Sequence, residues 1–435
     1  MTDLKPLVEI LKPIYGGAFL ARIDGKAVFV PLTLPGEQAR VRITEDKRSF
    51  ANAEVEEIVI AALQRVTPAC PYFGACGGCN YQHANYEAQL AFKQAILRET
   101  LERAGVKAPE EIFVLSANPW AYRNRIRLAF DANGNPGYRG RQSHSIVPIG
   151  ECPIAAPILV RTAMEAASLL RELNWPVRPT EISLFCNSDE SALLLSVFIR
   201  TASKGGFEEW MHALAKRSNA LVGAELIAQQ PSGKSLRTVG EWGWGAASIV
   251  YRAAGFDYRV DRGAFFQVNR WLVDALVDRV TNGRAGRLAW DLFAGVGLFA
   301  RKLADSFDRV IAVESAPAAM SALEHNLQGT TGAAVKAETL AFLRRHARSG
   351  NKAAGQSSVP DLIVVDPPRT GLGTEITTFL NEIAAAELVY VSCDPATLAR
   401  DLHALTSIYT IESLTLADLF PQTFHLETVV QLRRS

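Results

Sequence analysis

The sequence has little that would mark a membrane protein, a secreted protein or a uniformly basic one. Across its 435 residues no apolar run is long enough to span a membrane, and there is no internal repeat or low-complexity tract. No signal peptide is visible, so the 6 cysteines are expected to be free thiols of a cytoplasmic protein and not a disulfide framework. The formal net charge is only +1. Any contact with nucleic acid would therefore depend on local patches of charge.

The chain is long enough for several cores. With 48% hydrophobic residues, about two to three domains are expected. Short alternating strands at 18–23, 27–30 and 39–43, separated by glycine-containing turns, predict a small β-barrel over residues 1–62. Barrels of this kind bind nucleic acid through a strand face and its loops, although a purely structural barrel is the alternative. Residues 349–358 are predicted to form a surface loop.

Two apolar strands in the C-terminal half end in acidic residues, Asp291 and Glu314. The first runs into a glycine turn and a helix, where Gly295 and Gly297 would let the backbone approach a ligand. Glu314 follows Asp291 by 23 positions, the interval expected for a carboxylate that binds ribose hydroxyls. The turn has only two of the three glycines of a dinucleotide site. Its pattern, acid-x-Phe-x-Gly-x-Gly with Phe293 as the aromatic, is typical of S-adenosylmethionine-dependent methyltransferases.

Two further apolar strands also end in polar residues. Residues 361–365 lead to Asp366, and residues 387–391 lead to Cys393, which Asp-Pro follows. Ligands bind outside the carboxyl ends of the strands in an open α/β sheet, so the four turns should converge on one crevice. A cysteine in such a loop is able to meet a substrate. The alternatives are a cysteine that fills the core and an acid that caps the next helix.

With these motifs the chain resembles the RNA (uracil-5)-methyltransferases, specifically their iron-sulfur members that act mainly on 23S ribosomal RNA. The resemblance covers essentially the whole chain, and the matching motifs occur in order at residues 265–269, 291–297, 314, 366–369, 392–401 and 420–427. It implies that Cys393 is the nucleophile and Glu427 the base, with Asp366 beside them. The family usually has Asn where this chain has Asp394, so the role of that side chain is open.

The resemblance also assigns the pockets for the cofactor, S-adenosyl-L-methionine, and for uracil. The residues that it places there are Gln267, Asp291, Phe293, Gly295, Gly297, Glu314 and Asp366.

The chemistry of uracil methylation asks for the same residue types. Carbon 5 of uracil is a poor nucleophile, but addition of a thiolate at carbon 6 gives an enolate that attacks a sulfonium methyl group. A base must then remove the carbon 5 proton before the thiolate leaves. Glu427 lies in a C-terminal segment that could fold over the pocket, although by position alone it could be an ordinary surface carboxylate. The turn from Pro395 into a helix at 396–405 offers a helix N-terminus to activate the thiolate.

Two related chemistries fit less well. RNA cytosine-5 methyltransferases use a second cysteine in the motif after the third strand, and residues 366–371 contain none. Methylation of exocyclic amines typically has an aromatic residue after the Pro-Pro step, where this chain has Arg369. Both observations favour uracil.

Three cysteines lie in one short run, Cys70, Cys76 and Cys79, and Cys152 is the natural fourth ligand of a metal group. Glycines within the run allow the sharp turns that point several thiolates at one centre. Spacing alone leaves zinc as an alternative. The resemblance implies a 4Fe-4S cluster held by these four thiolates. Cys186, on an alternating strand, is expected in a core.

Between these cysteines, an alternating stretch at 122–130 runs into an Asn-Gly turn and predicts a β-hairpin. Five arginines in this region are candidates for phosphate contacts, with a solvated face as the alternative: Arg123, Arg125, Arg127, Arg139 and Arg141.

We therefore expect a three-part monomer with no membrane segment. Residues 1–62 should form an oligonucleotide-binding-like TRAM β-barrel, 63–255 a central α+β region with the iron-sulfur cluster, and 256–435 a Rossmann-like α/β methyltransferase domain. The expected reaction is methylation of carbon 5 of a specific uridine, in 23S ribosomal RNA or alternatively in transfer RNA. An inactive, cluster-bearing RNA-binding protein is the alternative of another class.

Overall fold

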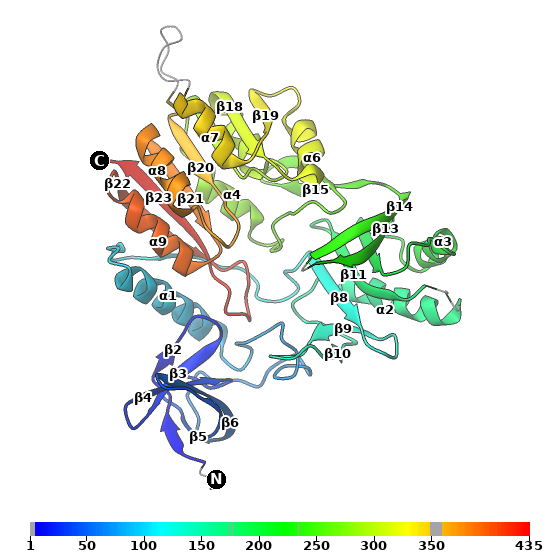
Figure 1. The fold of residues 1–435 in the computed structure, drawn as a ribbon, viewed down its shortest axis with the longest axis vertical. Coiled ribbons are helices and arrows are strands. Elements are labelled where there is room, and N and C mark those ends of the chain that lie inside the picture. The colour runs from blue at the N-terminus through cyan, green and yellow to red at the C-terminus, as the bar shows by residue number, and fades with distance from the viewer. Residues whose placement is uncertain (1–4, 174, 176, 234, 349–358) are drawn as a thin grey trace.

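The computed structural model describes residues 5–173, 175, 177–233, 235–348 and 359–435 (Figure 1). The surface loop predicted at 349–358 lies outside these residues. Within the described part of the chain the strands form sheets of six, seven and eight strands and one two-stranded hairpin. No helix in these ranges is both long and apolar enough to cross a membrane.

The N-terminal sheet is small and has the strand order β1-β5-β6-β4-β3-β2. Its strands are β1 (Leu7–Glu9), β2 (Lys12–Pro13), β3 (Ala18–Ile23), β4 (Lys26–Pro31), β5 (Gln38–Asp46) and β6 (Phe50–Ile60). Alternate side chains such as Phe19 and Val30 are buried inside it, as the period of two requires. The strands predicted at 18–23, 27–30 and 39–43 are confirmed. Tyr81 and Phe92, from outside the sheet, complete its core.

The central sheet has the order β10-β9-β8-β11-β12-β13-β14. Its strands are β8 (Arg125–Phe130), β9 (Pro136–Arg139), β10 (Ile146–Pro148), β11 (Pro179–Cys186), β12 (Leu193–Ile199), β13 (Leu221–Ser232) and β14 (Ser235–Gly245). Two amphipathic helices, α2 (Pro157–Glu172) and α3 (Phe207–Arg217), pack against the sheet in one apolar core. Cys186 is buried in that core. The expected hairpin is present as β8 and β9.

The C-terminal sheet has the order β19-β18-β17-β20-β21-β23-β22-β7. Its strands are β7 (Phe113–Leu115), β17 (Gly286–Leu292), β18 (Phe307–Glu314), β19 (Gly332–Lys336), β20 (Leu362–Val365), β21 (Glu387–Ser392), β22 (Tyr409–Ala417) and β23 (Glu427–Arg434). The run from β19 to β21 is parallel, and β23 is antiparallel to both its neighbours. The apolar strands bury both faces.

Helices cover the two faces of this sheet. One core holds α4 (Val273–Thr281), α5 (Leu298–Leu303), α6 (Pro317–Leu327) and the hairpin of β15 (Ser248–Ala253) and β16 (Phe256–Asp261). The core on the other side holds α1 (Tyr86–Arg103), α7 (Thr339–Arg348), α8 (Gly373–Ile383) and α9 (Pro395–Leu405). This is the Rossmann-like α/β architecture expected from the sequence.

Part of this domain comes from far upstream in the chain. Strand β7 pairs in parallel with β22, with Phe113 opposite Thr415. Helix α1 buries Ile96, Leu97 and Leu101 in the same core as α8 and α9. A segment that the sequence placed in the central region therefore completes the C-terminal sheet (Figure 1).

Candidate active site

Three of the predicted site residues stand where neighbouring strands end. Strands β20, β21 and β23 lie side by side, with Val365 opposite Tyr390 and Ser392 opposite Thr428. Asp366 is the residue after β20, Cys393 the residue after β21, and Glu427 the first residue of β23. Because β23 is antiparallel, its first residue lies at the same edge as the ends of the other two. The register therefore brings the thiol and both carboxyl groups together.

The electrostatics of Cys393 reflect that proximity. Burial raises the pKa of the Cys393 thiol to about 12, and the Glu427 and Asp366 carboxyl groups act in the same direction. Arg369 opposes them by favouring the thiolate. The side chain is partly exposed, as a thiol that must meet a substrate requires.

Glu427 and Asp366 are two buried carboxyl groups in the same pocket. Burial raises the pKa of both carboxyl groups, and for Glu427 the nearby Asp366 raises the pKa further. Glu427 is only 4% exposed. Two neighbouring carboxyl groups with little water around them share a proton more readily than they both ionise. The pocket can therefore hold a proton close to the thiol.

Gln267 faces this pair from a different part of the chain. Its Nε2 donates to Asp366 Oδ2 at 3.4 Å. Asn124 of the central region fixes the Gln267 segment through two hydrogen bonds. Its side-chain Nδ2 donates to Gln267 O at 2.8 Å, and its backbone N–H donates to Val268 O at 3.0 Å. The predicted pocket residue Gln267 is thus next to the carboxylates, held by the central sheet.

The glycine turn after β17 has the backbone that its sequence demands. Gly297 has φ +91°, and a Cβ there would lie 2.8 Å from Leu323 Cδ1. Phe293, which is not glycine, has φ +65°, a conformation that costs energy and is common at functional sites. Glu314 Oε2 accepts a hydrogen bond from the Gly295 amide at 2.8 Å. Glu314 and the turn are therefore brought together, as the predicted cofactor pocket requires.

Asp291 is placed more deeply than its neighbours. Its side chain is fully buried, and Oδ2 accepts a hydrogen bond from the Ala300 amide at 2.9 Å. Oδ1 has no hydrogen-bond partner among the described residues. Burial raises the pKa of Asp291 to about 8, with Asp366 and Glu314 contributing. Asp291 fixes the start of α5 behind the turn and is not an open wall of the pocket.

The loop that follows the thiol is held by its own aspartates. Asp394 Oδ1 caps α9, accepting hydrogen bonds from the Ala396 amide at 3.0 Å and the Thr397 amide at 2.9 Å. Asp401 accepts hydrogen bonds from Tyr390 Oη at 2.8 Å and from the Leu372 amide at 2.7 Å. Asp401 thus ties the loop after Asp366 to α9. Asp401 belongs to the motif at 392–401, but the sequence alone predicts no role for it.

The four predicted cluster cysteines lie near one another. Burial, together with the sulfurs of Cys152, Cys76 and Cys70, raises the pKa of Cys79 to about 12. Within the described ranges, however, no three His, Cys, Asp or Glu side chains are arranged so that they could hold a metal ion. The prediction of a metal group is therefore not confirmed by the geometry.

The surroundings of these thiols nevertheless suit a group of thiolates. The Gly78 amide donates to Cys76 Sγ at 3.4 Å, and Tyr138 Oη donates to Cys152 Sγ at 3.9 Å. A Cβ at Gly77 would lie 3.0 Å from Arg139 O, so the loop at residues 70–79, here called the cysteine loop, packs closely on the hairpin of β8 and β9. Four thiols with N–H and O–H donors around them match a four-thiolate site in ligand type and number.

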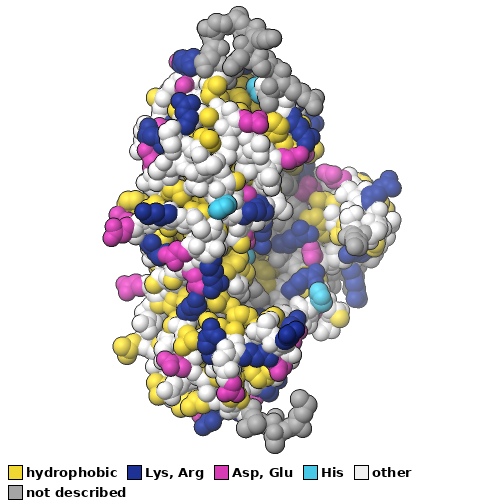
Figure 2. Space-filling view, turned by 60° about the vertical axis from the view of Figure 1, so that its left-hand side comes forward, with side chains coloured by type: hydrophobic (Ala, Val, Ile, Leu, Met, Phe, Trp, Pro, Cys, Tyr) yellow, Lys and Arg dark blue, Asp and Glu magenta, His cyan; other side chains and the backbone are white. Residues whose placement is uncertain are grey.

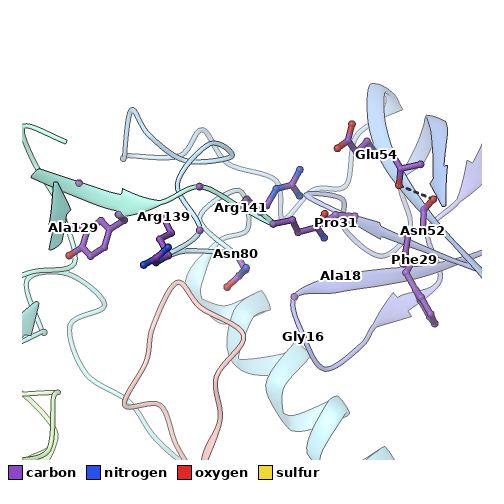
Figure 3. A pocket seen from close by; sticks show the side chains of 18 of the residues that line it. Gly16, Ala18, Phe29, Pro31, Asn52, Glu54, Asn80, Ala129, Arg139 and Arg141 are labelled. Carbon is purple, nitrogen blue, oxygen red and sulfur yellow. Dashed lines mark hydrogen bonds between the residues drawn. The ribbon is translucent and has the colours of Figure 1, made fainter. Parts of the chain in front are cut away.

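A cavity of about 590 Å³ lies between the N-terminal sheet and the central hairpin. Figure 3 shows Phe29 and Asn52 on one side of it and Arg139 and Arg141 on the other. The cysteine loop contributes Gly77 and Gly78 to the same wall. Figure 2 shows Lys and Arg side chains along a hollow on this side of the molecule.

The five hairpin arginines do not form one free face. Arg125 is covered, with its Nη2 donating to Ala264 O at 2.7 Å and its guanidinium 4.4 Å from the Phe185 ring centroid. Arg123 has a buried Nε without a hydrogen-bond partner among the described residues. Arg127 and Arg139 are exposed and both pair with Glu181. Arg125 and Arg127 alternate on one face of β8, whereas Arg123 precedes the strand. Ala264 of the C-terminal domain covers Arg125 on that face.

Comparison with known proteins places these features in a family. The model of the tRNA (uracil-5-)-methyltransferase family matches residues 208–435, and the TRAM domain model matches residues 7–55. The chain is 34% identical to an uncharacterized RNA methyltransferase of Streptomyces avermitilis, over 98% of this chain and 97% of that protein. It is 32% identical to the 23S rRNA (uracil(1939)-C(5))-methyltransferase RlmD of Chromohalobacter salexigens, over 94% of this chain and 85% of that protein.

The same architecture occurs in a crystal structure. The tRNA (uracil-54, C5)-methyltransferase of Pyrococcus abyssi, solved in complex with S-adenosyl-L-homocysteine, superposes with a TM-score of 0.76 at 23% sequence identity. The match covers 98% of this chain and 100% of that chain. The α/β fold with an N-terminal TRAM domain is thereby confirmed.

Proposed function

Because the chain belongs to the tRNA (uracil-5-)-methyltransferase family, we propose that it methylates carbon 5 of a specific uridine through a covalent adduct with Cys393. The observation that carries this proposal is the register that brings Cys393, Glu427 and Asp366 to one edge of the sheet. S-adenosyl-L-methionine supplies the methyl group as a sulfonium and leaves as S-adenosyl-L-homocysteine. The cofactor would be held by the glycine turn that follows β17, which includes Phe293, and by Glu314.

The residues act in a fixed order. The Cys393 thiolate adds to carbon 6 of uracil, which makes carbon 5 nucleophilic enough to take the methyl group. Glu427 then removes the carbon 5 proton, and the thiolate is eliminated to restore the ring. Gln267 and Asp366 lie next to Cys393 and Glu427, and their side chains offer hydrogen bonds to the polar edge of uracil.

The resting pocket favours protonated groups. Burial raises the pKa values of Cys393, Glu427 and Asp366 together, which disfavours the ionised form of each of these groups in the free protein. Arg369 is the positive charge that lowers the pKa of Cys393. Arg369 therefore favours the thiolate that the addition step requires.

The substrate class that we propose is 23S ribosomal RNA. The relative from Chromohalobacter salexigens, whose name specifies that RNA, aligns over 94% of this chain. The tRNA (uracil-54, C5)-methyltransferase of Pyrococcus abyssi also matches nearly the whole chain in fold. Transfer RNA is therefore the second candidate, and the experiment below separates the two.

We also propose that Cys70, Cys76, Cys79 and Cys152 hold an iron-sulfur cluster. The support is the proximity of the four thiols and the donors around them. The cluster would connect the loop at residues 70–79 to the segment around Cys152. The methyl-transfer chemistry described above needs no electron from it. Its place beside the cavity suits a structural role in the wall that RNA would contact.

The test is release of tritium from RNA labelled at uracil carbon 5, measured with cofactor on ribosomal and transfer RNA separately. We expect release from 23S ribosomal RNA that is lost in Cys393→Ala. The matched control is Cys186→Ala, which removes a buried thiol of the central sheet and should retain release.

Each other outcome is informative. Release from transfer RNA alone would replace the substrate class. Release that survives in Cys393→Ala would refute the covalent mechanism. No release from either RNA, with retained RNA binding, would favour an inactive RNA-binding protein.

A further inference from the structure

A residue of the N-terminal sheet reaches the catalytic pocket. Tyr15, in the turn between β2 and β3, donates its hydroxyl to Asp394 Oδ2 at 3.2 Å. Its ring meets the Phe424 ring edge-on, with centroids 5.5 Å apart and planes at 85°. Asp394 directly follows Cys393, and Phe424 lies just before Glu427. One side chain thus touches both loops that carry the proposed nucleophile and base.

The two oxygens of Asp394 have different partners. Oδ1 accepts the two amide hydrogen bonds that cap α9, whereas Oδ2 accepts the Tyr15 hydroxyl. The carboxylate therefore joins the helix after Cys393 to the N-terminal sheet. A hydrogen bond to a carboxylate is stronger than one between neutral groups.

Tyr15 remains a donor at ordinary pH. Burial raises its pKa well above the usual value, and the Asp394 and Cys393 side chains act in the same direction. The Tyr15 hydroxyl contacts Asp394, the residue that directly follows Cys393. A phenol that cannot ionise can hold the loop without competing for the thiol proton.

The turn that carries Tyr15 also forms a wall of the cavity. Gly16, Gly17 and Ala18 line it, and Figure 3 shows Gly16 and Ala18 on its N-terminal side. Gly16 and Gly17 have φ +106° and +89°, and a Cβ at Gly17 would lie 3.1 Å from the Asn80 side chain. Conformation disfavours side chains at both glycines, and at Gly17 the Asn80 side chain also leaves little space for a Cβ.

We propose that Tyr15 is a positioning residue for methyl transfer: it holds the Cys393 loop against the Glu427 loop from the N-terminal sheet. The inference rests on the proposed function, because it assumes that Cys393 forms the adduct. RNA that lies in the cavity contacts the turn that carries Tyr15. Occupation of the cavity by RNA is thus coupled to the placement of the nucleophile.

The test compares Tyr15→Phe, Asp394→Asn and the double variant with the wild type. RNA containing 5-fluorouridine and cofactor are supplied at saturation, and the rate of covalent adduct formation is measured on denaturing gels. Fluorine cannot leave carbon 5 as a proton does, so the adduct accumulates. We expect Tyr15→Phe to slow adduct formation about tenfold while the Kd for RNA changes less than twofold.

Two comparisons separate positioning from general packing. The double variant should be no slower than Tyr15→Phe, since both substitutions remove the same charge-assisted bond. The control is Tyr81→Phe, which deletes a buried hydroxyl that has no hydrogen-bond partner among the described residues. It should form the adduct at the wild-type rate.

The proposal is overturned if Tyr15→Phe matches the wild type, or if the two single effects multiply in the double variant. A parallel loss of RNA affinity and thermal stability in Tyr15→Phe would likewise overturn it in favour of a packing role. Absence of an adduct in the wild type would instead refute the proposed function itself.

Discussion

Lys93 and Asp418 form an ion pair in which neither side chain is exposed, with Lys93 Nζ 2.6 Å from Asp418 Oδ1. Lys93 also donates to Phe420 O at 2.9 Å, and Tyr86 Oη donates to Asp418 Oδ2 at 2.9 Å. Helix α1 thus holds the segment between β22 and β23 that leads to Glu427. Figure 1 shows this segment, in red, reaching from the C-terminal sheet toward α1.

Substitution of Lys93 by Met should therefore be costly. It leaves the Asp418 carboxylate buried without its cation, a change that destabilises by about 3–5 kcal/mol. Urea unfolding of the whole protein measures the loss. Lys12→Met is the control, because Lys12 pairs with Glu99 of the same helix at the surface, where an ion pair contributes about 0–1 kcal/mol. Equal losses in the two variants would contradict the role of the buried pair.

Replacement of Glu427 by Gln should separate methyl transfer from product release. Gln cannot take the carbon 5 proton, so methylated RNA should remain bound to Cys393 and appear as a slow band on denaturing gels. Tritium release should fall about 10²- to 10⁴-fold, the usual contribution of a general base.

Glu412→Gln is the matched control for Glu427→Gln, since Glu412 is an exposed partner of Arg433 on the neighbouring strand. It should leave tritium release unchanged. Rapid tritium release by Glu427→Gln with no accumulated adduct would remove Glu427 from the mechanism.

Asp291 should make the stability of the protein depend on pH. Its folded pKa, about 8, is above the unfolded value near 4, so the folded state retains a proton that the unfolded state has lost. Stability from this group is present at low pH and declines as the pH rises from about 4 to about 8.

Asp291→Asn keeps an oxygen for the Ala300 amide and removes the titration. The unfolding free energy of Asp291→Asn should exceed that of the wild type. This difference should grow by at most about 4 kcal/mol between pH 5 and pH 8. Chemical denaturation at several pH values checks this. The control is Asp305→Asn, an exposed member of a surface pair with Arg301. A margin independent of pH would show that Asp291 does not bind the proton.

Arg139 and Arg141 should contribute to RNA binding through phosphates. Both line the cavity beside the N-terminal sheet. Their joint replacement by Gln should weaken RNA binding roughly five- to tenfold at low salt and make the salt dependence of log K shallower by about 1 to 2. Arg217→Gln, on α3, removes an exposed arginine outside the cavity and controls for net charge. An unchanged salt slope in the double variant would exclude phosphate contacts by this pair.

The strand ends were the most predictable part of the site. Apolar runs that stop at Asp291, Glu314, Asp366 and Cys393 are local patterns, and parallel strands bring their carboxyl ends to one edge. The structure adds the antiparallel return of β23, which delivers Glu427 to the same edge. That return cannot be derived from periodicity, because an alternating strand has the same pattern in either direction.

The contacts between distant segments could not be predicted. Lys93 reads as an ordinary polar position of a helix, and Tyr15 as a turn residue, because each acquires its role from a partner more than 300 positions away. The exposure of the hairpin arginines could not be predicted for a related reason. Alternation gives the face of a strand to which Arg125 belongs, but not which domain covers it. The composition of β7 likewise does not reveal which sheet it joins.

Strand β7 also affects how the protein can be made. The ribosome produces α1 and β7 before the other elements of the C-terminal domain. Strand β7 therefore has no pairing partner until β22 has been synthesised. A shortened chain that begins at β17 would leave the backbone of β22 open as a free edge, a surface that invites aggregation. The C-terminal sheet is thus completed by residues 113–115, so we expect a chain that begins at β17 to lack its edge strand.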